Sequence, residues 1–277
     1  MTETGTLFLV GTPIGNLGDM TDRGRETLAA VDVVAAEDTR RTGRLLARFG
    51  IKARQVSLHE GNERARTEKV LALLRRGLDV AVVSDAGMPG VSDPGFRLVR
   101  ACAQEGIDVR VVPGPSAAVA ALVVSGLPTD RFVFEGFLPR RATERRARLA
   151  QAASDARTMI LFESPKRVRD TLRQMADALG DRRVALVREL TKMHEEVIRG
   201  RITEVLAEVE EREPRGEMVL VVEGASQQPS GDSRAAAARE AVELVESGVR
   251  PRAAAADAAR KHGVSANEVY RSLIERR

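Results

Sequence analysis

A regular alternation of short apolar runs with helical patterns constrains the fold of this chain more than any other feature. In the first 126 residues the runs are Thr6–Val10, Val33–Ala36, Gln55–Leu58, Val80–Val83 and Val109–Val112. Apolar runs of this length are typical of strands buried on both faces. Because a helical pattern follows each run, the sequence predicts an α/β fold with a parallel sheet covered by helices on both faces.

A polar or glycine-rich cluster follows each of these predicted strands. The carboxyl ends of parallel strands meet at one edge of a sheet, and open α/β sheets bind their ligands there. We therefore expect the candidate active site at this edge. The clusters are Gly11–Leu17, Glu37–Arg40, His59–Glu63, Ser84–Gly95 and Pro113–Ala117.

The segment Ser84–Gly95 is the most constrained of these clusters. It holds three glycines and two prolines in twelve positions. Glycine allows close approach of a ligand to the backbone, and proline stiffens the turn. An ordinary strand-to-helix connection is the weaker interpretation, because such connections are usually shorter.

The remainder of the chain predicts two further parts. Strand patterns at Phe132–Phe134, Thr158–Phe162, Val184–Val187, Val197–Ile198 and Met218–Val222 indicate a second α/β domain with more antiparallel character, and we expect a turn at Gly200. Ala225–Ser233 has linker composition. Helical patterns then cover Arg234–Ser247, Arg252–His262 and Ala266–Arg276. We predict domains at 1–126 and 127–225, followed by a linker and a small helix-turn-helix-like domain at 226–277.

Composition limits the class of protein only broadly. The net charge of +4 is compatible with a nucleic-acid partner but is too small to establish one. The single cysteine, Cys102, falls in a helical pattern and is most simply a core residue. The absence of an intramolecular disulfide fits a reducing cytoplasm. The first residues do not form a signal-peptide pattern, and no apolar run is long enough to span a membrane.

Several common site motifs are missing. Gly11–Gly15 spaces its glycines as G-x-x-x-G, which is neither the dinucleotide fingerprint nor a P-loop, and no G-x-S-x-G occurs. The three histidines are far apart, so a zinc site is not indicated, and we predict no metal. What remains is a set of strand-end carboxylates, which could bind Mg²⁺, ribose hydroxyls or a cationic ligand, or could simply cap helices. They are Glu37, Asp38, Glu60, Asp85, Asp93, Glu163 and Glu189.

The segment Arg140–Arg148 carries five arginines and one glutamate. Most charged runs on helices are solvated faces. This one is so one-sided that contact with a phosphate backbone is about as well supported as a solvated face.

Six motifs occur together in one order. They are G-T-P-I-G-N-L at Gly11–Leu17, A-E-D-T-R at Ala36–Arg40, the whole of Ser84–Gly95, V-P-G-P-S-A at Val112–Ala117, F-E-S-P-K-R at Phe162–Arg167 and R-E-L-T-K at Arg188–Lys192. In these motifs the chain resembles the tetrapyrrole methylase superfamily of S-adenosylmethionine-dependent enzymes. Within it, the chain is similar to the bacterial family that methylates the ribose 2′-hydroxyl of a cytidine in 16S ribosomal RNA. The resemblance covers about Thr6 to Glu223.

The resemblance implies two α/β domains that hold S-adenosylmethionine in the cleft between them, a homodimer, and a small appended helical domain. It points to a set of cofactor-binding residues from both domains. They are Pro13, Asp93, Gly95, Ser116, Ala117, Phe162, Glu163, Met218 and Val219.

For a ribose substrate, the residues that end strands on the predicted site edge suggest the groups that would bind it. We expect one of the carboxylates to orient or deprotonate the ribose hydroxyl, with Lys166 or Arg167 holding the adjacent phosphate. The carboxylates are Glu37, Asp38, Glu60, Glu163 and Glu189. Arg140, Arg141 and Arg145 are predicted contacts to the RNA, and Asp85 is predicted to be a structural turn residue.

Two rival interpretations remain. The first is methylation of a tetrapyrrole or another small acceptor, against which the basic helix and the helical appendage argue. The second is an RNA-binding module that binds the cofactor without catalysis.

Overall fold

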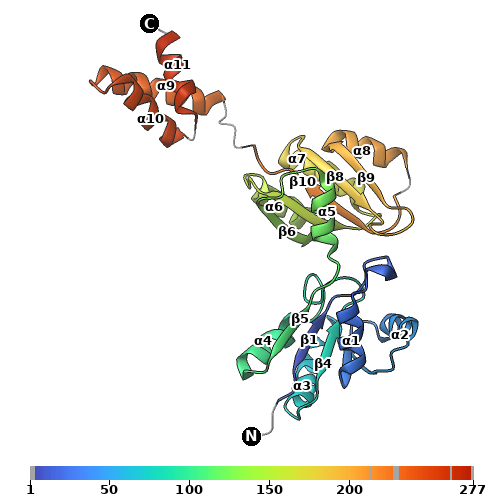
Figure 1. Ribbon diagram of the computed structural model, residues 1–277. Helices are drawn as coiled ribbons and strands as arrows, with labels where there is room; N and C mark the ends of the chain where they lie inside the picture. The colour runs from blue at the N-terminus through green and yellow to red at the C-terminus, as the bar shows by residue number, and fades with distance from the viewer. Residues whose placement is uncertain (1–3, 213, 227–230, 263, 276–277) are drawn as a thin grey trace. The chain divides into compact units, whose positions relative to one another are not determined.

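The computed structural model describes residues 4–212, 214–226, 231–262 and 264–275. The chain forms two compact units, and the boundary between them falls after Gly224. The first unit contains two sheets, and the second is helical (Figure 1).

The first sheet is entirely parallel. Its strands are β1 (Leu7–Val10), β2 (Val33–Ala36), β3 (Arg54–Ser57), β4 (Val80–Val83) and β5 (Val109–Val112). They lie in the order β3-β2-β4-β1-β5, and every neighbouring pair is parallel. The parallel sheet expected from the alternating pattern is therefore confirmed (Figure 1).

Helices cover both faces of this sheet. On one face α3 (Glu63–Leu74) and α4 (Phe96–Glu105) pack against Leu7, Val33 and Val80. On the other, α1 (Asp22–Ala30) and α2 (Thr39–Arg48) pack against Val10, Val34 and neighbouring strand residues. The two faces alternate along each strand because successive side chains point to opposite sides. The cysteine predicted to be a core residue, on α4, is buried in the first of these clusters.

The second sheet is mixed. Its strands are β6 (Phe132–Phe137), β7 (Thr158–Glu163), β8 (Arg183–Arg188), β9 (Glu196–Arg201) and β10 (Met218–Val222), in the order β6-β7-β10-β8-β9. Only the β6–β7 pair is parallel. The turn predicted at Gly200 is wrong: this residue lies inside β9 and pairs with Val184. The strand continues because its partner β8 is long enough to pair with six residues.

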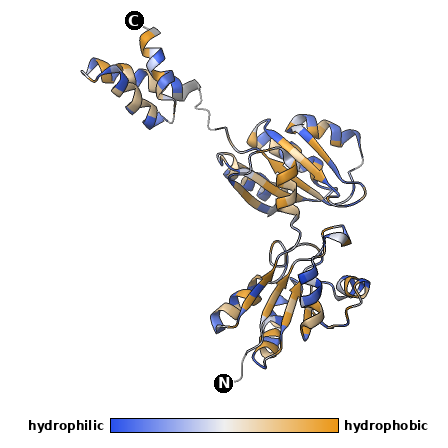
Figure 2. Cartoon of the chain, in the orientation of Figure 1, coloured by the Kyte–Doolittle hydropathy of each residue, from blue (hydrophilic) through white to orange (hydrophobic). Residues whose placement is uncertain are grey.

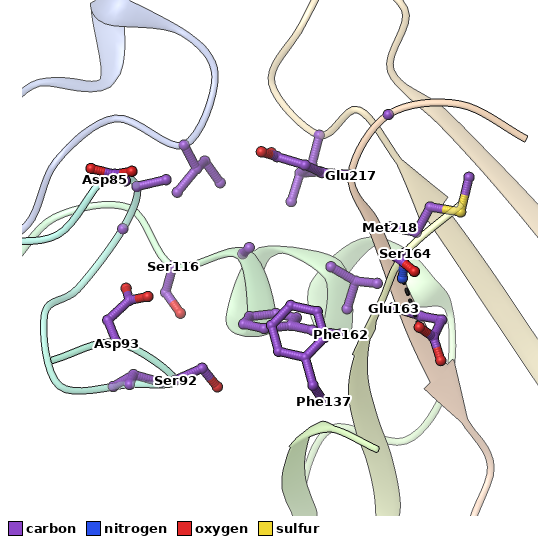
Figure 3. A pocket seen from close by; sticks show the side chains of 18 of the residues that line it. Asp85, Ser92, Asp93, Ser116, Phe137, Phe162, Glu163, Ser164, Glu217 and Met218 are labelled. Carbon is purple, nitrogen blue, oxygen red and sulfur yellow. Dashed lines mark hydrogen bonds between the residues drawn. The ribbon is translucent and has the colours of Figure 1, made fainter. Parts of the chain in front are cut away.

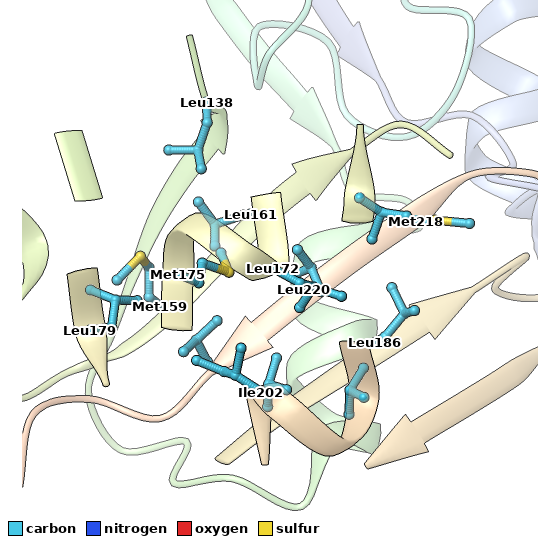
Figure 4. Close-up of a cluster of buried hydrophobic side chains, with 14 of the residues drawn as sticks. Leu138, Met159, Leu161, Leu172, Met175, Leu179, Leu186, Ile202, Met218 and Leu220 are labelled. Carbon is cyan, nitrogen blue, oxygen red and sulfur yellow. The ribbon is translucent and has the colours of Figure 1, made fainter. Parts of the chain in front are cut away.

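Both faces of the second sheet are also covered. Along β10, Met218, Leu220 and Val222 face a large cluster formed with α6 (Ala142–Ala152), α7 (Val168–Leu179) and α8 (Ile202–Glu211) (Figure 4). Val219 and Val221 face α5 (Ala117–Ser125) instead. This packing places α5 with the second sheet, whereas the sequence-based boundary at residue 126 assigns it to the first domain.

The helical unit contains α9 (Gly231–Glu246), α10 (Pro251–His262) and α11 (Ala266–Glu275) among its described residues. Its core consists mainly of alanines, with Val269 from α11. Figure 2 shows hydrophobic and hydrophilic residues alternating along these helices. The predicted linker extends too far, because residues 231–233 already belong to α9. Residues 227–230 of that linker and Arg276 of the last predicted helix lie outside the described residues. In the part of the chain that the structure describes, no helix is long and apolar enough to cross a membrane.

Candidate active site

The loops that follow β1, β4 and β5 are fastened to one another. Thr12 and Gly87 form an antiparallel bridge, and the Thr12 hydroxyl donates to the carbonyl of Ser84 at 3.2 Å. A Cβ on Gly11 would lie 2.6 Å from the Cα of Gly114, so the first and third loops touch through their backbones. Only glycine allows this approach, which explains two of the glycines in the motifs.

A cavity of about 380 Å³ lies against these loops. Its size is that of a small-molecule site. Residues from loops of both sheets line it (Figure 3). The first sheet contributes Ile14, Glu37, Arg41, Asp85–Met88, Val91–Asp93 and, before α5, Ser116 and Ala117; the second contributes Phe137, Phe162–Pro165, Val187, Leu190 and Gly216–Val219.

One side of this cavity is apolar. Phe137 and Phe162 meet edge to face, with ring centroids 5.5 Å apart, and Val187, Leu190 and Val219 lie nearby in the lining. Figure 3 shows the two rings beside the cavity, across from Ser92, Asp93 and Ser116. Such a wall suits a flat, largely apolar group of a ligand.

The opposite side is acidic. Burial raises the pKa of Asp93 to about 6, and the negative charges of Glu37 and Asp85 add to the shift, while a hydrogen bond from Ser84 opposes it. Arg41 partly balances this negative charge, because its Nη1 lies 3.2 Å from Oδ2 of Asp85. A ligand that brings a positive charge would relieve the repulsion around Asp93.

Most of the predicted cofactor-binding residues line this cavity, but two do not. Seven of the nine line it: Asp93, Ser116, Ala117, Phe162, Glu163, Met218 and Val219. Pro13 lines a neighbouring cavity of about 520 Å³ instead. Gly95 lines neither cavity, and its amide is occupied, because it donates to the buried carboxylate of Glu63 at 2.9 Å. The same Glu63 oxygen accepts from the Arg97 amide at 3.0 Å, so Glu63 caps the first turn of α4.

Among the predicted catalytic carboxylates, Glu37 is the one that lies at the cavity with an accessible side chain. It accepts from the Asp85 amide at 3.1 Å through one oxygen. Glu163 also borders the cavity, but its side chain is only 1% exposed. It accepts from the Thr171 hydroxyl at 2.6 Å and from the Ser164 amide, so it holds the loop after β7.

The other predicted catalytic residues lie outside the cavity. Asp38 caps α2 and pairs with Arg40, which lowers the pKa of Asp38. Glu189 accepts from Lys192 at 2.9 Å, and this hydrogen bond lowers the pKa of Glu189. Glu60 and Lys166 are exposed and line neither cavity. Helix capping and ion pairing, rather than contact with a ligand, account for Asp38 and Glu189.

Of the predicted RNA contacts, Arg145 needs correction, and Arg167 has partners within the protein. Arg145 is only 5% exposed, and its Nε donates to Gln174 at 2.9 Å. It is therefore buried where α6 packs against α7. Arg167 donates to the carbonyls of Leu138 and Pro139. The sequence pattern of Arg140–Arg148 does not show which of its arginines is buried. Arg140 and Arg141 are exposed, but they precede α6 rather than lie on it.

The sequence prediction missed several lining residues. Asp85, assigned to a structural turn, lines both cavities and accepts from the Asp38 amide at 3.1 Å. Glu217, immediately before β10, lines both cavities, and Phe137 contributes a ring to the first cavity from the end of β6. Glu217 precedes the predicted strand Met218–Val222, and Phe137 lies beyond the predicted strand Phe132–Phe134. A pattern of polar residues at the carboxyl ends of strands therefore selects neither. Among the residues that the structure describes, no group of three or more His, Cys, Asp or Glu side chains is arranged to hold a metal ion.

A family model, described as tetrapyrrole (corrin/porphyrin) methylases, matches residues 6–206. The chain belongs to the tetrapyrrole methylase family. The match confirms the family that the six motifs predicted. The residues that line the cavity lie within the matched part of the chain, except for Gly216–Val219 at its second-sheet side.

Individual members of the tetrapyrrole methylase family are also similar to this chain. Ribosomal RNA small subunit methyltransferase I of Escherichia coli O157:H7 is 47% identical over 98% of this chain and 95% of its own length. The protein of the same name from Thermotoga maritima is 48% identical over 79% of this chain and 99% of its own. A crystal structure of uroporphyrin-III-C-methyltransferase from Thermus thermophilus matches 78% of this chain and 91% of that one with a TM-score of 0.54 at 25% identity.

Proposed function

We propose that this protein uses S-adenosylmethionine to methylate the ribose 2′-hydroxyl of a cytidine in the RNA of the small ribosomal subunit. The observation that carries the proposal is the 47% identity to a small-subunit rRNA methyltransferase over 98% of this chain, including the helical unit beyond the family model. The likeness to a tetrapyrrole methylase is weaker, at 25% identity, and supports C-methylation of a small acceptor less well.

The cavity suits the proposed cofactor. S-adenosylmethionine, when bound, supplies a methyl group activated by a positively charged sulfur. Phe137 and Phe162 offer an apolar wall for its adenine ring, and Asp93, whose pKa is raised to about 6, offers a carboxylate to its positive charge. Ser116 and Met218 complete the lining between these two sides.

We assign to Glu37 the role of orienting the acceptor hydroxyl. One of its oxygens is held by the Asp85 amide, which leaves the other to accept from a ligand at the cavity. Methyl transfer needs in-line geometry above all, so orientation supplies much of the acceleration. Acceptance of the hydroxyl proton by the same carboxylate would add a factor of about 10²–10⁴.

The partners follow from the same proposal. An rRNA substrate implies action in the cytoplasm, and the family resemblance implies a homodimer. Arg140 and Arg141 stay proposed RNA contacts because both are exposed.

Transfer of a labelled methyl group tests the function directly. Purified protein, labelled S-adenosylmethionine and unmethylated small ribosomal subunits should give label in the ribose of one cytidine. Label in a tetrapyrrole would favour the first rival, and cofactor binding without any transfer would favour the second.

Glu37→Gln tests the role of the carboxylate. We expect single-turnover methylation to slow by about 10²–10⁴ while cofactor affinity stays near that of the wild type. Glu60→Gln is the matched control, because Glu60 is exposed and lines neither cavity. A Glu37→Gln protein that methylates at the full rate would remove Glu37 from the mechanism.

A further inference from the structure

Helix α2 has a basic face that no predicted contact included. Arg41, Arg44 and Arg48 are spaced by three and four residues, so they lie on one side of the helix. All three line the 520 Å³ cavity. At 1.5 Å per residue, the row spans about 10 Å along the helix axis.

Two of these arginines are not neutralised. Arg41 pairs with Asp85, but among the described residues Arg44 and Arg48 form no ion pair and no side-chain hydrogen bond. Both are exposed. On α6, Arg145 is buried and Arg148 pairs with Glu135 at 2.6 Å, while Arg146 is exposed and forms no ion pair among the described residues. Arg44 and Arg48 differ from Arg146 because they line a cavity that adjoins the candidate active site.

The basic row borders a groove that is continuous with the candidate active site. The two cavities share five lining residues, which are Ile14, Arg41, Asp85, Ala86 and Glu217. Across the groove from α2, the loop after β1 contributes Pro13, Gly15 and the exposed Leu17. A Cβ on Gly15 would lie 2.5 Å from the Cγ of Lys192, so this loop packs tightly against the loop after β8.

We infer that this groove holds the sugar-phosphate backbone of the acceptor RNA strand beside the methylated nucleotide, with Arg44 and Arg48 contacting its phosphates. The inference rests on the proposed function. A ribose inside a chain can reach the first cavity only if its flanking phosphates leave through an adjoining opening, and the groove is continuous with that cavity. A row of unpaired arginines suits the repeated charge of a strand better than a single anion.

The double variant Arg44→Ala/Arg48→Ala tests the inference in the full-length protein. Binding to unmethylated small ribosomal subunits is measured between about 50 and 200 mM KCl. Loss of two phosphate contacts should make the slope of log affinity against log salt shallower by about 1.4 to 1.8. The wild type should then lose about tenfold more affinity than the variant across that range.

Two further variants control the experiment. Arg23→Ala/Arg100→Ala removes the same charge from exposed arginines on α1 and α4 that line neither cavity, and it should bind subunits like the wild type. Arg44→Lys/Arg48→Lys keeps the charge and should restore most of the affinity. Cofactor affinity, measured by calorimetry, should be unchanged in every variant.

The outcomes separate the inference from the function on which it rests. If the Arg44→Ala/Arg48→Ala protein keeps the wild-type slope while the wild type methylates subunits, the groove is not the RNA path. The inference also fails if the variant binds subunits weakly but binds deproteinised 16S rRNA like the wild type, because the arginines then contact a ribosomal protein. If the wild type neither binds nor methylates subunits, the proposed function fails first.

Discussion

At the scale of single residues, Asp93 is held in a setting that disfavours its charge. Burial and the neighbouring carboxylates of Glu37 and Asp85 raise its pKa to about 6. A carboxylate with a raised pKa is easier to protonate in the folded state than in the unfolded state. Its contribution to stability is therefore fully present below about pH 4 and is lost as pH rises through about 6. At neutral pH the charge of Asp93 therefore lowers the free energy of unfolding, and the same charge attracts a positively charged ligand.

Replacing Asp93 with Asn should separate the two effects. The free energy of unfolding should rise above about pH 6, where the wild type carries the unfavourable charge, and change little below about pH 4. Wild-type affinity for S-adenosylmethionine should fall by about tenfold from pH 7 to pH 5, because protonation removes the charge that attracts the ligand. The Asp93→Asn protein should bind weakly at both values. Calorimetry and thermal melting measure these quantities, and a variant that keeps the pH dependence of binding would assign it to another group.

At the scale of elements, the loop Ser84–Gly95 is held at both ends by other parts of the first sheet. Its start is tied to the loop after β1 through the bridge between Thr12 and Gly87. At its end, Gly95 is the N-cap of α4 and has no side chain to cap the helix. Glu63 of α3 supplies the acceptor instead, at 2.9 Å from the Gly95 amide and 3.0 Å from the Arg97 amide.

Glu63→Ala should therefore loosen this loop as well as the helix. Removing the acceptor leaves buried amide donors unsatisfied, and we expect a loss of about 1–3 kcal/mol in the free energy of unfolding. Cofactor affinity should fall too, because Asp93 lies on the same loop. Urea denaturation measures the first effect and calorimetry the second. Glu68→Ala is a suitable control, since the Glu68 carboxylate is exposed and pairs only with Arg75 among the described residues; an equal loss there would contradict the capping role.

At the scale of the whole molecule, the chain divides into two units of different character. Both sheets and both cavities lie within the unit that ends at Gly224. The helical unit has its own core of alanines and Val269. The relative from Thermotoga maritima matches 79% of this chain over 99% of its own length, so a protein of that name exists that is about as long as the first unit alone.

A chain shortened to residues 1–224 should fold and bind S-adenosylmethionine. We expect its affinity to equal that of the full chain and its cooperative unfolding to be retained, because none of the described residues of the helical unit lines either cavity. Calorimetry and circular dichroism provide the measurements. Loss of cofactor binding in the shortened chain would mean that the helical unit stabilises the site, contrary to this expectation.

The linear pattern of the sequence determined the architecture. Short apolar runs, alternating with helical patterns, predicted the parallel sheet and its helical cover, and turn-rich clusters after the strands predicted the edge at which Asp93 and Ser116 line a cavity. These features are local in sequence, because burial on two faces requires apolar residues at consecutive positions. The motifs in a fixed order likewise determined the family.

Only the tertiary structure decided which polar side chains are free. Arg145 and Glu163 are buried and hydrogen-bonded to neighbouring side chains, whereas Arg44 and Arg48 are exposed and unpaired among the described residues. It also decided that α5 packs on the second sheet. Whether a charge is neutralised depends on partners that are distant in the sequence, such as Gln174 for Arg145. A local pattern contains no information about such partners, so the roles of individual charged residues emerged from the fold.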